Sequence, residues 1–279
     1  MSDVRTRVLY LTDLTYQARG RRYCDEDIQL SADLRQHFVL ALCHPLDALD
    51  LMDDFDVVVV RNTGPVIHYQ QAYDAFTRRA RDAGAKVFTE LTGKADQRGK
   101  QYLLDLFAAG LPVIPTIERP DEIKRLPSVQ EYVLKPKMGA DSVGLRFVGP
   151  EDLNSMELDG TLVQPRIDIT YEVSFYFVGR TFHYALYAPD QESRWGLEPY
   201  PPTDADLRFA QMFVDWNTID YGIQRVDACR TVDGDLLLVE LEDLNPFLSL
   251  DRIAPAQRQA FVDDVVASIA HLADAARSR

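Results

Sequence analysis

A predicted β-hairpin near the C-terminus carries the charged residues whose spacing has the clearest chemical meaning. Asp233–Gly234 lies between two runs of alternating apolar residues, a pattern typical of a hairpin with a two-residue turn. With that turn, Asp227 lies opposite Glu240 and Arg225 lies opposite Glu242. Because opposed residues of an antiparallel pair share a face, these four side chains form one cluster.

The cluster contains three acids and one base, and its excess of negative charge requires a partner. Carboxylates that face each other directly repel, and a salt-bridge network with the arginine would neutralise them only in part. Mg²⁺ prefers a few carboxylates together with waters and substrate phosphates. We therefore favour a magnesium site at Asp227, Glu240 and Glu242 over a purely structural network. Leu236 and Leu238 continue the alternation on the same face, which predicts that the cluster lies at the mouth of a core.

A second candidate element is the glycine loop within Val133–Gly144, which joins two predicted strands. It is not a P-loop, because Leu145–Arg146 stands where that motif needs a lysine and a hydroxyl residue, and no helix follows it. Its backbone N–H groups could still bind phosphate oxygens, with Lys135 and Lys137 supplying positive charge. A surface hairpin with exposed lysines explains the same residues, and the loop by itself leaves both interpretations open.

Two segments that leave the carboxyl ends of predicted parallel strands could hold a substrate, residues 13–27 and 61–69. The first contains Arg21 in a basic stretch, which is either a solvated loop or a patch that binds carboxylates. Arg61 is the better candidate, because it directly follows a buried strand and precedes a turn.

The elements that must position these residues differ between the two parts of the chain. The first ninety residues or so alternate strands and helices, which predicts an α/β unit with a parallel open sheet. The remainder has an α+β pattern of strand, glycine loop, strand, hairpins and a final amphipathic helix. The predicted strands are 8–11, 38–42, 56–60 and 86–90 in the first part, and the predicted helices are 25–36, 69–83, 99–109 and 258–277.

Composition excludes several classes of function. The 279 residues include 30 Lys and Arg against 44 Asp and Glu, a net charge of −14. Such acidity argues against a nucleic-acid binder and against an anionic membrane surface as partner. The three cysteines and five histidines are scattered, so we expect neither disulfides nor a zinc site. No segment has signal-peptide or membrane-spanning character, which predicts a cytoplasmic protein; a homo-oligomer remains an open alternative to a monomer.

Taken in order, these features resemble the ATP-grasp superfamily. The resemblance is carried by a lysine at a strand end in VLKP, a loop of small residues, and a late hairpin with RVD, ELE and then NP. That superfamily includes glutathione synthetase, D-alanine–D-alanine ligase and the ligases that add glutamate to ribosomal protein. The resemblance implies a preceding α/β domain at 1–92 and an ATP-grasp domain at 93–279. The latter would divide into 93–166, with the glycine loop, and 167–279, with the acidic hairpin.

The resemblance also implies roles for individual residues. Asp227, Glu240 and Glu242 match the magnesium ligands, Arg225 the arginine at the reacting phosphate, and Arg194 the arginine over the reaction centre. Asn245, Arg61 and Arg21 are the candidate substrate residues. The residues that would contact ATP, through phosphates, adenine or ribose, are Lys100, Lys135, Gly139, Ala140, Asp141, Ser142, Gly144, Gln164, Pro165, Arg166, Ile167 and Glu172.

Three departures from the superfamily pattern bear on activity. Glu242 stands where many members have asparagine, although some subgroups carry the Glu-x-Glu form. The first lysine of the pattern falls on Gly99, so either Lys100 or Lys94 replaces it or the contact is lost. Tyr187 stands where a basic residue is expected.

The function implied by the resemblance is an ATP-dependent carboxylate–amine ligase with Mg²⁺ as cofactor. It would phosphorylate a small, amino-acid-like carboxylate to an acyl phosphate, and an amine would then displace the phosphate to form an amide. A small-molecule kinase on the same scaffold and a non-catalytic nucleotide-binding protein are the alternatives.

Overall fold

The N-terminal part is built on a four-stranded parallel sheet in the order β4-β1-β5-β6. The computed structural model describes residues 5–18, 21–61, 66–139, 144–153, 156–190 and 196–275. β5 consists of four valines, none more than 1% exposed, because helices cover both faces of this sheet. The four strands are β1 (Arg7–Leu11), β4 (Val39–Cys43), β5 (Val57–Val60) and β6 (Val87–Phe88).

Helices from both ends of the chain enclose this sheet. Alternate residues of β1 belong to two different cores, with Leu9 packed toward α3 and Val8 toward α1 and α7. Gly84 ends α3 in the left-handed conformation, with φ of 63°, as its sequence position predicts. The helices are α1 (Cys24–Leu34), α2 (Ala48–Leu51), α3 (Gln70–Ala83) and the C-terminal α7 (Pro255–Asp274), and a small hairpin of β2 (Gln17–Ala18) and β3 (Arg21–Arg22) precedes α1.

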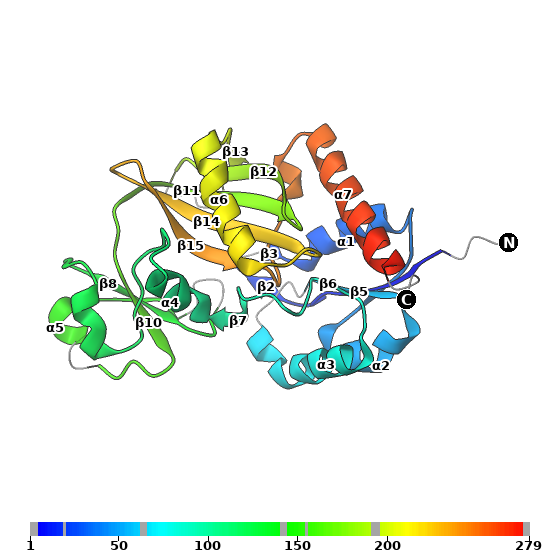
Figure 1. The fold of residues 1–279 in the computed structure, drawn as a ribbon, viewed down its shortest axis with the longest axis horizontal. Coiled ribbons are helices and arrows are strands. Elements are labelled where there is room, and N and C mark those ends of the chain that lie inside the picture. Colours follow the sequence, from blue (N-terminus) through cyan, green and yellow to red (C-terminus); the bar gives the residue numbers. More distant parts are fainter. Residues whose placement is uncertain are drawn as a thin grey trace.

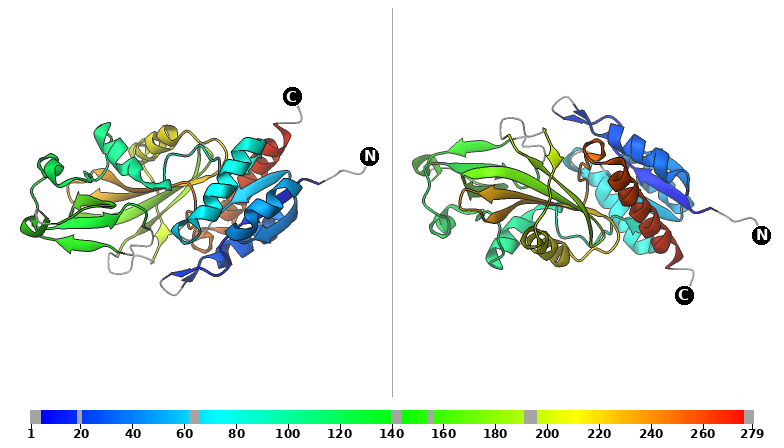
Figure 2. Two further views of the ribbon diagram at one scale, coloured as in Figure 1. Left: turned by 90° about the horizontal axis from the view of Figure 1, so that it is seen from below. Right: turned by 90° about the horizontal axis from the view of Figure 1, so that it is seen from above.

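The C-terminal helix α7 returns to the N-terminal sheet. This helix packs beside α1 over the N-terminal sheet, so the first strand and the last helix lie at the same end of the molecule (Figures 1 and 2). The division at residues 92 and 93 remains a prediction, since the last helix shares a core with the first strands.

A three-stranded antiparallel sheet in the order β10-β8-β9 lies at the opposite end of the molecule (Figure 1). α4 begins two residues later than the predicted helix, because Gly99 has a left-handed φ of 68° and Lys100, with φ of −87° and ψ of 21°, is not helical. The elements are β7 (Gln97–Lys100), α4 (Gln101–Ala108), β8 (Tyr132–Pro136), β9 (Arg146–Val148), α5 (Pro150–Leu153) and β10 (Thr161–Pro165).

A five-stranded antiparallel sheet in the order β13-β12-β11-β14-β15 lies between these two sheets (Figure 2). α6 packs its phenylalanines on one face of this sheet. This helix is not among those predicted from the sequence, although Thr203 and Asp206 form a capping box at its start. The elements are β11 (Ile169–Val178), β12 (Thr181–Ala188), β13 (Glu198–Pro199), α6 (Asp204–Asn217), β14 (Ile223–Thr231) and β15 (Leu236–Glu242).

The turn between β14 and β15 differs from the predicted two-residue turn. Thr231 N donates to Asp235 O at 2.8 Å, so the loop consists of the three residues 232–234. Gly234 has φ of 93°, and the left-handed conformation at the end of a three-residue loop favours glycine. The predicted turn at Asp233–Gly234 is therefore wrong by one residue.

A β-bulge at Val239 cancels this error before the acidic residues are reached. Asp227 pairs with Glu240, whereas Ala228 pairs with Leu238, which leaves Val239 without a partner in the ladder. The bulge also separates the two faces of β15. Leu238, like the leucine two residues before it, lies in a core with α6, so the prediction that these leucines share a face with the acids is wrong.

The fold class predicted from the sequence is confirmed: a parallel α/β part followed by antiparallel sheets with few helices. Among the described residues, no helix combines the length and the apolar character that crossing a membrane would require.

Candidate functional site

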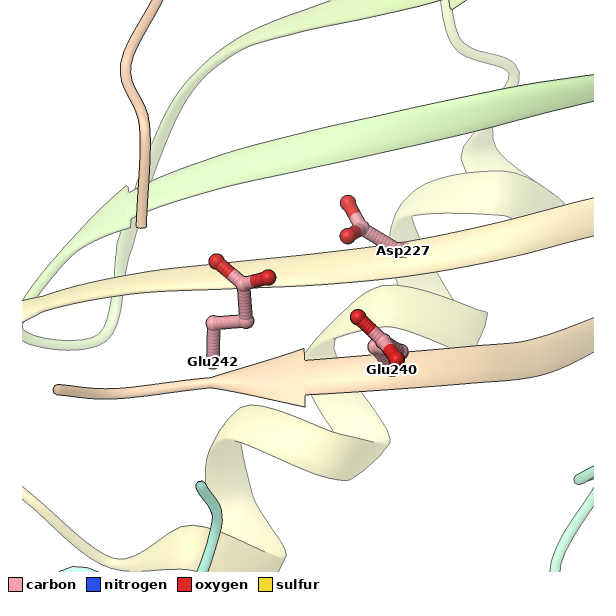
Figure 3. A group of neighbouring side chains, drawn as sticks. All are labelled: Asp227, Glu240 and Glu242. Carbon is pink, nitrogen blue, oxygen red and sulfur yellow. The ribbon is translucent and has the colours of Figure 1, made fainter. Parts of the chain in front are cut away.

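The β14–β15 hairpin gathers three carboxylates on one face. Asp227 lies opposite Glu240, and Glu242 lies opposite Arg225, which confirms the predicted pairing. One carboxylate oxygen from each acid lies within 4.8 Å of those from the other two. Figure 3 shows the three side chains on neighbouring strands with their carboxylates on the same side of the hairpin. Three hard oxygen donors are thus close enough together to share one divalent cation.

Arg225 holds two of these acids in place. Its guanidinium donates from Nη2 to Asp227 Oδ2 and to Glu242 Oε1, both at 2.8 Å. Nη1 donates to the carbonyl oxygen of Phe247 at 3.0 Å, and Ser174 Oγ donates to Asp227 Oδ1 at 2.6 Å. The salt-bridge network that the sequence offered as an alternative is therefore present, and it orients the acids without occupying all of their oxygens.

The two glutamates sit in different electrostatic surroundings. Burial alone would raise the pKa of Glu240, but Lys100, whose Nζ lies 2.6 Å from Glu240 Oε1, and then Lys135 lower this pKa to about 2. Burial raises the pKa of Glu242 to about 8, although Arg225 opposes the shift. A cation bound between the carboxylates would stabilise their charged forms, so the donor set fits Mg²⁺.

A cavity of about 410 Å³ opens onto these carboxylates. It is bounded by β8 and β10 of the three-stranded sheet and by β11, β14 and β15 of the five-stranded sheet. The structure therefore brings together residues that are more than a hundred positions apart in the sequence. The expected site residues that line it are Lys100, Lys135, Gly139, Gln164, Pro165, Arg166, Ile167, Glu172, Arg225, Asp227, Glu240, Glu242 and Asn245.

The segment expected to contact adenine ends β10 at the wall of this cavity. Gln164 is 2% exposed, and its Nε2 donates to Thr116 Oγ1 at 2.8 Å, which fixes the side chain and leaves the backbone of this segment at the cavity. Arg166 forms an ion pair with Glu131, and its guanidinium lies over the ring of Phe147 at 5.8 Å.

The glycine loop is described in part. Gly139 lines the cavity, whereas Gly144 is not among the lining residues, and Ala140, Asp141 and Ser142 lie outside the described residues. Gly144 has φ of 79°, and a Cβ there would lie 2.8 Å from Pro136 Cγ, so this position requires glycine.

The structure distinguishes the two lysines that the sequence left open. Lys100 lines the cavity beside Glu240. Lys94 is not a lining residue; its Nζ donates to the carbonyl oxygen of Trp216 at 2.7 Å and lies 5.2 Å from the centre of that ring.

Arg61, the better substrate candidate, is not among the described residues that line the cavity. It is 1% exposed, and its Nε donates to Asp27 Oδ1 at 3.0 Å while Nη2 donates to Pro246 O at 2.9 Å. The strand end thus directs this arginine into the interior. The backbone of Arg21 belongs to β3, its side chain lies outside the described part, and so does the whole of Arg194.

Several lining residues were not singled out in the sequence. Asp96 lies just before Lys100 and accepts hydrogen bonds from the backbone N–H groups of Asp243 and Leu244 at 2.7 and 2.8 Å. Tyr23 and Phe247 bring aromatic rings to the cavity. The only sequence signal for Phe247 is its position directly after Asn245–Pro246.

No protein-family model matches the chain, and no curated protein matches it significantly. Several solved structures match the chain. The D-cycloserine synthetase DcsG is 20% identical, with a TM-score of 0.71 over 93% of this chain and 99% of that one. D-alanine–D-alanine ligase from Bacillus anthracis, complexed with ATP, is 13% identical, with a TM-score of 0.69 over 96% and 99%. The ATP-grasp ligase PsnB, complexed with precursor peptide PsnA2 and AMPPNP, is 13% identical, with a TM-score of 0.64 over 96% and 99%.

The chain has the ATP-grasp fold. The recognition made from the hairpin and the glycine loop is confirmed at this level. At these identities the likeness is one of fold, and what an ATP-grasp chain of this sequence does depends on the residues in its own cavity.

Proposed function

We propose that this protein is an ATP-dependent ligase that joins a carboxylate to an amine through an acyl phosphate, releasing ADP and phosphate. The observation that carries the proposal is the meeting of Asp227, Glu240 and Glu242 with Lys100 and other cations in one cavity of an ATP-grasp fold. Structural neighbours support it, since they are a synthetase, a ligase complexed with ATP and a ligase complexed with AMPPNP.

The acidic face would hold Mg²⁺ through Asp227, Glu240 and Glu242, and the metal would neutralise charge on the transferred phosphoryl group. The cationic residues of the cavity would bind and orient the substrates. Lys100 and Lys135, which both line the cavity and both lower the pKa of Glu240, would contact phosphate oxygens of ATP. Phosphoryl transfer depends mainly on positioning and charge stabilisation, so the absence of a nucleophilic side chain from this scheme is consistent with it.

Arg225 would act at the carboxylate that is being phosphorylated. It already contacts Asp227 and Glu242, and it donates to the carbonyl oxygen of Phe247. From there it would stabilise the developing charge on the carboxylate as it becomes an acyl phosphate.

The test is ADP release, measured with amino acids singly and in pairs, with Mg²⁺ present or chelated. A ligase releases ADP only when a carboxylate and an amine are both present, and chelation stops the release. ADP release with one hydroxyl compound and no amine would show a kinase instead. A failure of the protein to bind AMPPNP with Mg²⁺ in calorimetry would contradict nucleotide chemistry altogether.

A further inference from the structure

The charge of the cavity lining differs from one part of the chain to another. The described charged lining residues are Asp96, Lys100, Lys135, Arg166, Glu172, Arg225, Asp227, Glu240 and Glu242. A group of uncharged lining residues comes mainly from the N-terminal part and from the chain after β15. It consists of Tyr23, Val66, Gln70, Tyr176, Leu197, Asn245, Phe247 and Ser249. We call it the neutral compartment.

Two aromatic rings from distant parts of the chain meet in the neutral compartment. The ring centres of Tyr23, at the start of α1, and Phe247, after β15, lie 5.2 Å apart with planes tilted by 45°. Tyr16 packs edge-on against Tyr23, with ring centres 5.6 Å apart. Phe247 is only half-buried, so part of its ring faces the cavity.

The backbone that carries Phe247 is held from several directions. We call residues 245–249 the strap, because they cross from the acidic hairpin to the N-terminal part. Three consecutive carbonyl oxygens of the strap accept hydrogen bonds from side chains of three different elements. The pairs are Arg61 with Pro246 (2.9 Å), Arg225 with Phe247 (3.0 Å) and Tyr184 with Leu248 (2.7 Å).

The strap is also held through an N–H group, since Leu248 N donates to Glu26 Oε1 at 2.6 Å. A ring fixed in this way loses little freedom when a ligand packs against it, which favours binding. The alternate strap residues Asn245 and Ser249 line the same compartment, and both are uncharged.

The neutral compartment adjoins the reacting end of the site. Arg225 donates both to Glu242 and to the carbonyl oxygen of Phe247, so the residue that carries the ring is bonded to the same guanidinium as the acids. A carboxylate bound beside Arg225 would therefore have the strap as its neighbour.

We propose that the carboxylate substrate carries an aromatic ring that packs against Tyr23 and Phe247. This inference rests on the proposed ligase function and names its substrate class. The rings of Tyr23 and Phe247 offer apolar surface to a substrate side chain, which favours an aromatic ring over an acidic or basic group. Burying a ring rather than a methyl group gives a preference of at least about tenfold in affinity.

The experiment is calorimetric titration of three carboxylates, 3-phenylpropionate, propionate and succinate, into protein saturated with AMPPNP and Mg²⁺. We expect 3-phenylpropionate to bind at least about tenfold more tightly than either of the others. In Phe247→Leu, which removes the ring but keeps an apolar side chain, this preference falls to about threefold or less. Phe55→Leu is the matched control, because Phe55 is a half-buried ring away from the cavity, and it keeps the full preference.

The outcomes separate this inference from the proposed function. Equal binding of the three probes, no binding of any, or an unchanged preference in folded Phe247→Leu overturns the aromatic subsite even when AMPPNP binds. A Phe247→Leu protein that fails to fold is replaced by Tyr23→Leu, judged by the same criterion. Titrations without nucleotide are run in parallel, so that a loss of AMPPNP binding contradicts the ligase while the ring preference is still measured.

Discussion

The buried Arg61 and the half-buried Arg225 each donate to a carbonyl oxygen of the strap, yet their surroundings differ in kind. Arg61 pairs with Asp27 at 3.0 Å, and these side chains are 2% and 0% exposed. Arg225 pairs with Asp227 at 2.8 Å, and these side chains are 16% and 18% exposed because they face the cavity. Both clusters pair an arginine with an aspartate at a similar distance, but only the second faces the cavity. We call the cluster around Arg61 the closed cluster and the cluster around Arg225 the open cluster.

The charge balance of the two clusters also differs. In the closed cluster, Tyr10 and Thr12 donate to Asp27 and complete its hydrogen bonds, and burial holds the pKa of Glu26 at about 7. The cluster is thereby close to one positive and one negative charge. In the open cluster, three acids share Arg225 and Lys100, and burial raises the pKa of Glu242 to about 8. A bound cation would favour the charged form of this third acid. An ion pair at a cavity is thus a candidate functional site when it is accessible and has a further acid beside it.

The largest expected effect comes from removing a charge in the open cluster. Glu240→Gln takes away one of the three shared carboxylates, and we expect kcat for ADP release to fall at least about 10³-fold, or about 4 kcal/mol. The protein should stay folded, as shown by an unchanged circular dichroism spectrum. Glu157→Gln, at an exposed position outside the cavity lining, is the matched control and should keep full turnover. Normal turnover in Glu240→Gln would refute the metal assignment.

In the closed cluster the same kind of deletion should act on stability. Arg61→Met leaves Asp27 as a buried charge without its guanidinium, and we expect the free energy of unfolding to fall by about 3 kcal/mol in urea denaturation. Magnesium should not restore this loss. Arg225→Met should destabilise less, and Mg²⁺ should recover part of the loss by replacing the missing positive charge. Equal recovery in both variants would remove the distinction between the clusters.

The protonation of Glu26 provides a third test. Burial raises its pKa from 4.5 to about 7, against the lowering influence of Arg61. The folded protein therefore holds this proton more tightly than the unfolded chain, and the resulting stability is full below about pH 4.5 and is lost as the pH rises through about 7. Between these values the free energy of unfolding of the wild type should fall by about 2 to 3 kcal/mol more than that of Glu26→Gln. Parallel pH curves for the two proteins would contradict the assignment of this proton to Glu26.

Much of the open cluster could be predicted from the sequence because it depends on local pairing. Asp227 and Glu240 face each other across one hairpin, so alternation and a turn signal were sufficient. The prediction held even though the turn was one residue too short, because the bulge at Val239 restored the pairing. A bulge of this kind is set by packing on the two faces of the sheet, and alternation alone does not reveal it.

The closed cluster could not be predicted in the same way. Arg61 follows a buried strand, and that position is equally compatible with an arginine facing a substrate and one facing the interior. Its partners decide the matter, and they lie far away in the sequence, at Asp27 and at the carbonyl oxygen of Pro246. The neutral compartment escaped prediction for the same reason, since Tyr23 and Phe247 meet only in the folded chain.

Lys94 and Lys100 allow a further test of the difference between side chains at the cavity and side chains away from it. They lie in one short segment but contact different regions. Lys100 Nζ lies 2.6 Å from Glu240 at the cavity, whereas Lys94 Nζ donates to the carbonyl oxygen of Trp216 at 2.7 Å. Lys100→Met should weaken AMPPNP binding with Mg²⁺ about tenfold in calorimetry, or about 1.4 kcal/mol, because one cation facing the phosphates is lost. Lys94→Met is the matched control and should leave this affinity within about twofold. Loss of the hydrogen bond to the carbonyl oxygen of Trp216 should instead lower the free energy of unfolding. A larger loss of affinity in Lys94→Met would mean that the segment moves on binding and that cavity access in the free protein does not identify the functional lysine.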